Sequence, residues 1–292
     1  MDDRRATVVA AELSKTFAAR RVRPRSEGMS FGVLESLRVS SVIRRTIAAR
    51  NAPLQVIRAV DGVSFRAEPG QIFGLLGPNG AGKTTTMRLI ATTVTPTGGT
   101  ASVAGFDIRQ SPIDVRKHLG VLTTNIGLYA RLTARENVAY YARLYGIDPA
   151  LANKRIDELF RLLDMEEFAD RRTDNFSSGM KQKVAIARAV VHDPPVMIFD
   201  EPTTGLDVMS SRTVINFIRA ARDEGKCVIL STHIMHEVEK LCDTTCIIYQ
   251  GKVVATGTPA DLLQRTGKQD LEDAFLALVD GSQMIEEHLA NA

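Results

Sequence analysis

Residues 77–84 read GPNGAGKT and match the pattern G-x-x-x-x-G-K-[ST], whose residue types and spacing are typical of a phosphate-binding loop. The segment directly follows an apolar run at 72–76 and precedes a helix-like stretch that begins at Thr85. Glycines in such a loop allow tight curvature, so successive backbone N–H groups and a helix N-terminus can point at one anion. We therefore predict a nucleotide-binding site here, in preference to a glycine-rich turn with a chance lysine.

Residues 77–84, called the phosphate loop below, contain two side chains with specific predicted roles. Lys83 would direct positive charge toward the β and γ phosphates, and Thr84 would offer its hydroxyl to Mg²⁺. The residues expected to contact the nucleotide are Gly77, Pro78, Asn79, Gly80, Ala81, Gly82, Lys83, Thr84 and Thr85. Mg²⁺ is therefore predicted as a cofactor beside the nucleotide.

Two adjacent carboxylates, Asp200 and Glu201, follow the apolar run at 196–199. In open α/β sheets, ligands bind at the carboxyl ends of the strands. Adjacent residues on a strand point in different directions, so Asp200 could order Mg²⁺ through its water shell while Glu201 faces the γ-phosphate and an attacking water. This arrangement favours hydrolysis over the alternative, a strand that simply ends in acidic surface residues.

Short apolar runs alternate with amphipathic stretches along the rest of the chain. Buried strands are predicted at 72–76, 119–122, 196–199 and 227–230, and helices at 85–90, 179–191 and 210–222. Shorter strand-like runs, which suit an antiparallel side sheet, lie at 8–13, 62–65 and 100–103. The alternation predicts an α/β fold with a mostly parallel sheet that is covered by helices on both faces.

The character of the chain changes between 124 and 172. Thr133 and Glu136 form a capping-box pattern before apolar residues at helical spacing, and a second helix is predicted at 149–163. Residues 124–172 are therefore expected to form a helical insert between strands of the core. A terminal hairpin at 247–254 and two further helices, in a C-terminal helical extension at 258–292, complete the predicted elements.

The composition is that of an ordinary soluble globular protein: 292 residues, 44% apolar and 24% charged. No apolar run approaches the roughly 20 residues that span a bilayer, and the first residues lack the apolar region of a secretory signal, so a cytoplasmic location is expected. The three cysteines, Cys227, Cys242 and Cys246, are too few for a disulfide framework. A zinc site that combines the last two with His233 and His236 is an alternative, although its spacing matches no familiar zinc finger.

Positive charge is concentrated near the N-terminus. Residues 18–58 contain nine Arg and two Glu, whereas the whole chain has a net charge of only +3. Such a basic insertion could contact phospholipid head groups, an acidic partner or nucleic acid, or it could be a solvated loop.

Together these motifs make the chain resemble the ATP-binding subunits of ABC transporters. The signature segment (residues 176–182, FSSGMKQ), the strand motif VMIFDEP at 196–202, the D-loop (residues 204–207, TGLD) and a switch histidine, His233, follow the phosphate loop in the family's order. The resemblance covers 59–257 and implies a P-loop NTPase core, an antiparallel side sheet and a helical subdomain. Residues 1–257 would form the ATP-binding domain.

The resemblance implies a head-to-tail dimer in which each ATP lies between the phosphate loop of one subunit and the signature segment of the other. His233 would contact the γ-phosphate and hold Glu201 in register with the attacking water, and Asp207 would cross toward the partner's phosphate loop. Phe17 would lie against adenine. The signature residues expected to contact the nucleotide are Ser177, Ser178 and Gly179.

Two positions depart from the family's pattern. Thr124 stands where the family usually has a glutamine that touches Mg²⁺ and the membrane subunit, so Thr124 is the third predicted metal ligand after Thr84 and Asp200. Ser178 replaces the common second glycine of the signature segment. Because Lys83, Asp200, Glu201 and His233 are all present, we still expect an active ATPase.

Residues 127–133 and 179–183 look most like those of bacterial exporter subunits, including sodium-efflux and multidrug types. The expected partners are a separate membrane-spanning permease and a second ATP-binding subunit, identical or different, at the cytoplasmic face of the membrane. The basic insertion at 18–58 is hypothesised to touch the inner leaflet or the permease. A soluble ABC-type ATPase acting on DNA or ribosomes is the main alternative, but the chain has neither two cassettes nor a long coiled coil, so no nucleic-acid partner is expected.

Overall fold

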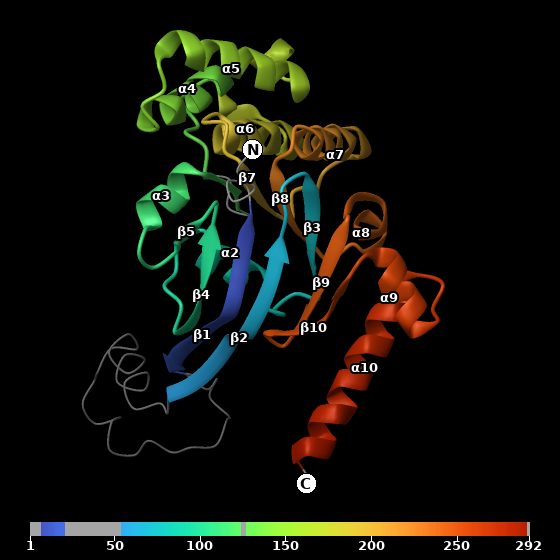
Figure 1. Cartoon of the computed structure of the whole chain (residues 1–292). Coiled ribbons are helices and arrows are strands. Elements are labelled where there is room, and N and C mark those ends of the chain that lie inside the picture. The colour runs from blue at the N-terminus through green and yellow to red at the C-terminus, as the bar shows by residue number, and fades with distance from the viewer. Residues whose placement is uncertain (1–6, 21–53, 124–126, 291–292) are drawn as a thin grey trace, which may run out of the picture.

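A computed structural model describes residues 7–20, 54–123 and 127–290 of the chain (Figure 1). Thr124 and most of the predicted basic insertion lie outside these residues. The described part contains two β-sheets, a group of helices above them and a long C-terminal helix.

The central sheet has six strands in the order β10-β9-β3-β8-β7-β6. Their bounds are Gln71–Leu76 (β3), Leu119–Leu122 (β6), Val196–Asp200 (β7), Cys227–Thr232 (β8), Thr244–Tyr249 (β9) and Lys252–Gly257 (β10). Every neighbouring pair is parallel except β9 and β10, which form the predicted terminal hairpin. The prediction of a mostly parallel sheet is therefore confirmed.

Successive side chains of the central strands belong to two different cores, because a strand points them alternately to opposite faces. On β3, Ile72 and Leu76 join a core that also contains residues of α6 (Ser178–Val190) and α7 (Val208–Asp223). Phe73 and Leu75 join a second core with α2 (Lys83–Ile90) and the side sheet. The sheet is thus covered on both faces, and the residues of its middle strands β3, β7 and β8 are buried, except for the half-buried Gln71.

The side sheet is antiparallel, with strand order β2-β1-β4-β5. Its strands are Val8–Arg20 (β1), Leu54–Ala67 (β2), Gly98–Val103 (β4) and Phe106–Asp107 (β5). The first two strands are much longer than the runs predicted at 8–13 and 62–65. The pairing register shifts between Ala10 and Thr16, and Glu12 adopts a left-handed φ of 49°, so the alternating apolar pattern is interrupted while the pairing continues. Ala18 and Arg58, at the ends of the predicted insertion, consequently lie in β1 and β2.

The helical subdomain follows β6 and precedes β7, as predicted, and lies at the top of Figure 1. It contains Ala134–Leu144 (α4), Pro149–Leu162 (α5), Glu166–Phe168 (η3) and Thr173–Asn175 (η4). The capping box is formed: the Glu136 N–H donates to Thr133 Oγ1 at 3.1 Å, and the Thr133 N–H donates to Glu136 Oε2 at 2.8 Å. Pro112–Lys117 (α3) precedes β6 and was not predicted.

The C-terminal part adds three helices beside β9 and β10: Met235–Leu241 (α8), Pro259–Thr266 (α9) and Leu271–Ala290 (α10). Only the last two were predicted. Leu271, Ala274 and Phe275 of α10 are buried, and its far end projects away from the body of the molecule (Figure 1). Within the described ranges, no helix combines the length and the apolar character needed to span a bilayer.

Candidate functional site

Three loops meet at the carboxyl ends of β3, β8 and β7, because these strands are parallel neighbours. Leu76, which precedes the phosphate loop, pairs with Thr232, and Asp200 pairs with Ser231. The phosphate loop, the two carboxylates and the segment that ends in His233 are therefore neighbours, although more than 100 residues separate the first two in sequence. The sequence predicts the phosphate loop and the two carboxylates at the carboxyl ends of buried strands, and the family resemblance implies that His233 lies beside them.

Two glycines of the phosphate loop are required by close backbone contacts. A Cβ atom on Gly77 would lie 2.1 Å from the carbonyl oxygen of Ile248, which is far inside van der Waals contact. Gly82, the N-cap of α2, has φ 110°, and a Cβ there would lie 2.5 Å from the carbonyl oxygen of Ala59. Neighbouring backbone thus fills the space that a side chain would need, and it holds the loop in its curve.

Lys83 lies at the mouth of the loop with only 5% of its surface exposed. Its Nζ donates to the carbonyl oxygens of Gly77 at 2.5 Å and Pro78 at 3.2 Å, and it lies 3.9 Å from Oε1 of Glu201. Burial lowers the pKa of Lys83, and the nearby carboxylates of Glu201 and Asp200 oppose that shift. An ammonium group held by carbonyl oxygens beside a row of backbone N–H groups is well placed to receive a phosphate.

Asp200 forms the centre of a cluster of oxygen atoms and is 3% exposed. Its carboxylate accepts from Thr84 Oγ1 at 2.9 Å and from Ser231 Oγ at 2.5 Å. Carboxylate and hydroxyl oxygens fit a hard cation such as Mg²⁺, which usually takes only one or two protein ligands and completes its shell with phosphates and water. Thr84 and Asp200, the two described residues predicted to hold the metal, therefore lie together as expected.

The alternative zinc site is not formed. No group of three or more His, Cys, Asp or Glu side chains in the described residues could hold a metal ion. Cys227, Cys242 and Cys246 are buried, and burial raises the pKa of each thiol. They are packing residues.

Glu201 has a strained backbone, and hydrogen bonds hold its side chain. Its φ of 50° lies in the left-handed region, which costs a non-glycine residue about 1–3 kcal/mol. Its N–H donates to the carbonyl oxygen and to Oγ of Ser231, both at 3.1 Å. Its carboxylate lies 3.1 Å from Nδ1 of His233 and accepts from Thr204 Oγ1 at 3.2 Å. The turn after β7 thus directs the carboxylate toward His233 and Lys83.

The start of the signature helix α6 packs on the start of α7. Ser177 caps α6 by accepting from the Met180 N–H at 3.2 Å, and Ser178 Oγ donates to the carbonyl oxygen of Gly205 at 3.4 Å. A Cβ on Gly179 would lie 2.4 Å from Oγ and 3.0 Å from Cβ of Ser210, so a larger residue here would displace the Ser210 side chain. The side-chain contacts of the signature serines are therefore with their own helix and with the D-loop.

Asp207 caps α7. It accepts from the N–H of Ser210 at 2.9 Å and from the hydroxyl of Ser210 at 2.7 Å. These two hydrogen bonds lower the pKa of Asp207. The D-loop and the signature segment consequently form one packed unit, joined further by the bond from Gln182 to the carbonyl oxygen of Pro202 at 2.8 Å.

Phe17 lies on β1 and is 40% exposed, with Lys15 Nζ 5.2 Å from its ring centroid. An exposed aromatic ring is suited to stacking against a base, as the family resemblance implies. Thr124, the third predicted metal ligand, lies outside the described residues.

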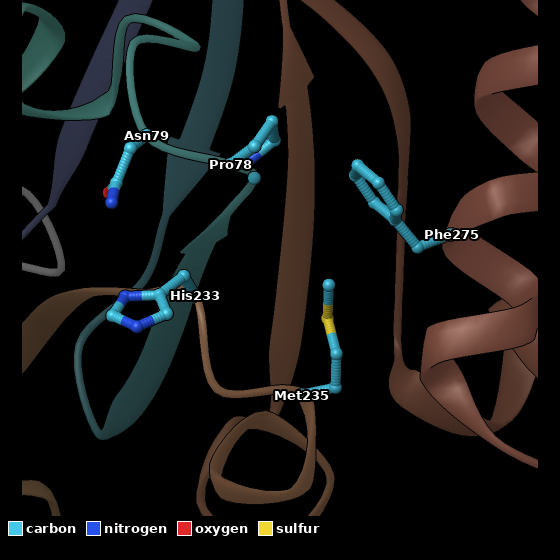
Figure 2. Close-up of a pocket in the computed structure, with 6 residues that line it drawn as sticks. Pro78, Asn79, His233, Met235 and Phe275 are labelled. Atoms are coloured by element: carbon cyan, nitrogen blue, oxygen red, sulfur yellow. The ribbon is translucent and has the colours of Figure 1, made fainter.

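A cavity of about 290 Å³ lies beside the phosphate loop (Figure 2). Figure 2 shows Pro78 and Asn79 on one side, His233 and Met235 below them, and Phe275 of α10 opposite. The C-terminal helix therefore contributes a wall next to the nucleotide site. Sequence reasoning missed this contribution, because Phe275 appeared only as one apolar residue of an amphipathic helix. No pattern in the sequence indicates that Ser231 bonds both Asp200 and Glu201.

The profile of the family described as ABC transporter matches residues 60–204. The ABC transporter ATP-binding protein NatA of Bacillus subtilis (strain 168) is 43% identical over 224 residues, which span 76% of this chain and 91% of that protein. The chain belongs to the ABC transporter ATP-binding family. This ABC subunit is also 40% identical over 204 residues to the Nod factor export ATP-binding protein I of Paraburkholderia xenovorans (strain LB400), covering 70% of the chain and 67% of that protein.

Solved structures agree with this assignment. The ABC subunit matches a structure of an ATP-binding subunit of an ABC transporter with a TM-score of 0.73 and 27% identity, over 93% of this chain and 99% of that one. It matches the dimeric, post-hydrolysis ATP-binding cassette MJ0796, bound to ADP and Pi, with a TM-score of 0.67 and 21% identity over 86% and 98% of the two chains. The family, the α/β P-loop fold and the ATPase class predicted from the sequence are therefore confirmed.

Proposed function

We propose that this ABC subunit hydrolyses ATP at a site shared by two cassettes and that the hydrolysis drives a separate membrane-embedded exporter. The observation that carries the proposal is the contact between Glu201 Oε1 and His233 Nδ1 at 3.1 Å, with Lys83 Nζ 3.9 Å from the same carboxylate oxygen. These groups combine a base, an orienting imidazole and a cation at the end of a phosphate loop. Such a combination can position and deprotonate a water molecule and stabilise the charge that develops during phosphoryl transfer.

In the proposed reaction, Lys83 and the backbone N–H groups of the phosphate loop bind the terminal phosphates of ATP. Glu201 accepts a proton from a water molecule as the water oxygen bonds to the γ-phosphorus. The bond from that phosphorus to the β–γ bridging oxygen breaks, which releases ADP and inorganic phosphate. His233 holds the Glu201 carboxylate and contacts the γ-phosphate. Thr84 and Asp200 would hold Mg²⁺, which neutralises phosphate charge when it is bound.

The second half of the site is proposed to come from a second cassette. Ser177, Ser178 and Gly179 begin a helix of 13 residues whose N-terminal N–H groups suit an anion, yet the side chains of both serines bond within their own packed unit. A partner's nucleotide would meet these donors if two subunits pack head to tail, with Asp207 near the partner's phosphate loop. The relative MJ0796, described as a dimer with ADP and Pi, supports this arrangement.

The membrane partner is proposed from the relatives. NatA is named as an ABC transporter ATP-binding protein, and the Paraburkholderia relative is named for Nod factor export. By analogy, this subunit would be peripheral on the cytoplasmic face of the membrane and would bind a permease. The test is copurification of the tagged full chain with a membrane protein, followed by ATPase assays after reconstitution. The exporter assignment would be contradicted if no membrane protein copurifies, or if the copurifying membrane protein does not raise the ATPase rate.

Lipid contact by the basic insertion at 18–58 stays a sequence-based proposal, and most of that segment lies outside the described residues. Reversal of charge at Arg44 and Arg45 is expected to reduce association of the full chain with anionic vesicles, because each basic residue near such a surface contributes about 1 kcal/mol. Cosedimentation with vesicles measures the effect. Equal association of variant and parent would rule out the lipid contact.

A further inference from the structure

A third carboxylate, that of Glu237, connects the two segments that present Glu201 and His233. Glu237 lies in the first turn of α8, which begins just after His233. Its Oε2 accepts from Thr203 Oγ1 at 2.9 Å and from Thr232 Oγ1 at 3.4 Å. Both threonines are buried, so these hydrogen bonds face little competition from water.

The two threonines occupy corresponding places next to the catalytic pair. Thr203 comes two residues after Glu201 on the turn that leaves β7, and Thr232 immediately precedes His233 at the end of β8. The polypeptide chain links Glu201 to Thr203, and the Glu237 carboxylate accepts hydrogen bonds from both Thr203 and Thr232. The polypeptide chain then links Thr232 to His233, whose Nδ1 lies 3.1 Å from the Glu201 carboxylate. Covalent bonds and hydrogen bonds therefore close a ring.

A ring of this kind restrains the distance between the segment after β7, which carries Glu201, and the segment after β8, which carries His233. In the described part of the chain, strand pairing does not extend to either segment. The ladder between β7 and β8 ends at the pair Asp200 and Ser231. Beyond it, Glu201 adopts a left-handed φ of 50°, a conformation that persists only when its surroundings restrain it. Ser231 restrains Glu201 from the strand side through its carbonyl oxygen and hydroxyl. Glu237 supplies the restraint from the other side.

The hydrogen-bond roles are chemically consistent. The Thr232 hydroxyl donates its proton to Glu237 and accepts from the Ile234 N–H at 3.0 Å, which fits the one donor and two acceptor sites of a hydroxyl. The two threonine hydroxyls require an acceptor at position 237. A methyl group there would leave both buried hydroxyls without that acceptor.

We infer that Glu237 is a positioning residue for hydrolysis: it holds the base Glu201 and the imidazole of His233 at their mutual distance without touching ATP. The inference rests on the proposed function, because it assigns a role to Glu237 within that same site. ATP would be held by the phosphate loop, whereas the hydrogen-bond partners of the Glu237 carboxylate in the described residues are Thr203 and Thr232. Loss of Glu237 should therefore slow turnover and leave ATP binding intact.

A neighbouring carboxylate on the same helix offers a matched control. Glu239 Oε1 accepts from the Leu271 N–H at 2.8 Å, so it fastens α8 to the C-terminal helix α10. Residues two apart on a helix point in different directions. Glu239→Ala removes a carboxylate of α8 and the hydrogen bond that it accepts, whereas Glu237→Ala removes two such bonds; only the second change opens the ring.

The experiment measures kcat and KM for ATP with the full chain, together with the thermal midpoint of each variant. Glu237→Ala is expected to lower kcat by about ten- to a hundredfold, because a displacement of about 1 Å at a reacting group can cost a hundredfold in rate. The KM should change by less than about threefold, since the loss lies in the chemical step and not in binding. Glu237→Gln keeps an oxygen acceptor and should recover most of the rate. Glu239→Ala should keep the parental kcat even where it lowers the thermal midpoint.

A second variant keeps the inference testable if Glu237→Ala does not fold. Thr203→Val preserves the volume at position 203 and removes the hydroxyl that Glu237 accepts from. Thr203→Val should also lower kcat. The double variant Thr203→Val with Glu237→Ala should have a kcat no lower than that of the slower single variant, because both changes break the same ring. Multiplicative losses, or equal kcat losses in Glu237→Ala and Glu239→Ala, would overturn the inference.

The two proposals fail in different ways. If the parental chain turns over no ATP under any condition, including with its membrane partner, the proposed function fails. If the parental chain turns over ATP and Glu237→Ala matches it in kcat, only the positioning role fails.

Discussion

The ring of His192 stacks on the ring of Tyr145, with centroids 3.8 Å apart and planes inclined by 3°. Tyr145 is the C-cap of α4 in the helical subdomain, and His192 lies in the connection between α6 and β7. The pair therefore joins the end of the helical subdomain to the core. Burial lowers the pKa of His192 to about 4.

Because burial lowers the pKa of His192, we predict that the protein loses stability in mild acid. The unfolded chain takes up a proton at position 192 near the ordinary histidine pKa of about 6.5, whereas the folded chain does so only near 4. Stability from this group is therefore complete above pH 6.5 and falls as the pH drops toward 4. A pKa difference of one corresponds to roughly 1.4 kcal/mol, so the difference between 6.5 and about 4 limits the loss to about 3.5 kcal/mol. Urea denaturation at pH 7.5 and pH 5 measures it.

His192→Phe keeps an aromatic ring against Tyr145 and removes the titrating group. Its urea midpoint should fall less between pH 7.5 and pH 5 than that of the parental chain. The control is His236→Gln, since His236 is exposed on α8 and its loss should preserve the parental pH response. Identical pH responses of His192→Phe and the parental chain would show that His192 does not cause the acid sensitivity.

Glu201→Gln is expected to abolish most ATP turnover without abolishing ATP binding. The amide retains the shape of the side chain but accepts no proton from water, and a general base contributes about 10² to 10⁴ in rate. Phosphate release should fall at least a hundredfold on that scale, and ATP should convert monomer to dimer in light scattering after gel filtration. Glu224→Gln, an exposed change at the C-cap of α7, is the control. A Glu201→Gln protein that stays monomeric with ATP, with and without its membrane partner, would contradict the shared site.

Lys83→Met should weaken nucleotide binding. The ammonium group is buried beside the carbonyl oxygens of Gly77 and Pro78, and a charged hydrogen bond of this kind contributes about 1.5–3 kcal/mol, or roughly ten- to a hundredfold in affinity. Equilibrium binding of a fluorescent ATP analogue provides the measurement. Lys117→Met removes an exposed lysine paired with Asp114 and should leave the affinity unchanged. If both variants bind equally well, Lys83 is not a phosphate ligand.

Gly82→Ala should destabilise the fold as well as the phosphate loop. The new Cβ would lie 2.5 Å from the carbonyl oxygen of Ala59 at a φ of 110°, so backbone must move. We expect a loss of about 2 kcal/mol or more in the free energy of unfolding, the range in which backbone strain operates. Gly98→Ala is the comparison, because its Cβ would meet nothing nearer than 3.5 Å, an ordinary contact. Equal urea midpoints for the two variants would show that the loop can relax.

The parts of this protein that were predicted correctly depend on neighbours in sequence. The phosphate loop is a run of eight residues, and the capping box of Thr133 and Glu136 spans four, so each pattern carries its own geometry. The parallel sheet followed from apolar runs separated by helices, because such runs are buried on both faces. The extent of β1 and β2 was not predicted, since the pairing beyond Glu12 joins residues that lie between 34 (Arg20 and Leu54) and 50 (Leu13 and Val63) positions apart.

The sequence by itself determined that the chain binds nucleotide with a phosphate loop, that carboxylates follow a buried strand, and that the family is that of ABC ATPases. Only the tertiary structure decided that Ser231 bonds both Asp200 and Glu201, that Glu237 joins Thr203 to Thr232, and that Phe275 forms a wall beside the phosphate loop. The reason is physical. Motifs arise from short-range backbone geometry, whereas these contacts exist only where sheet pairing and core packing bring distant segments together.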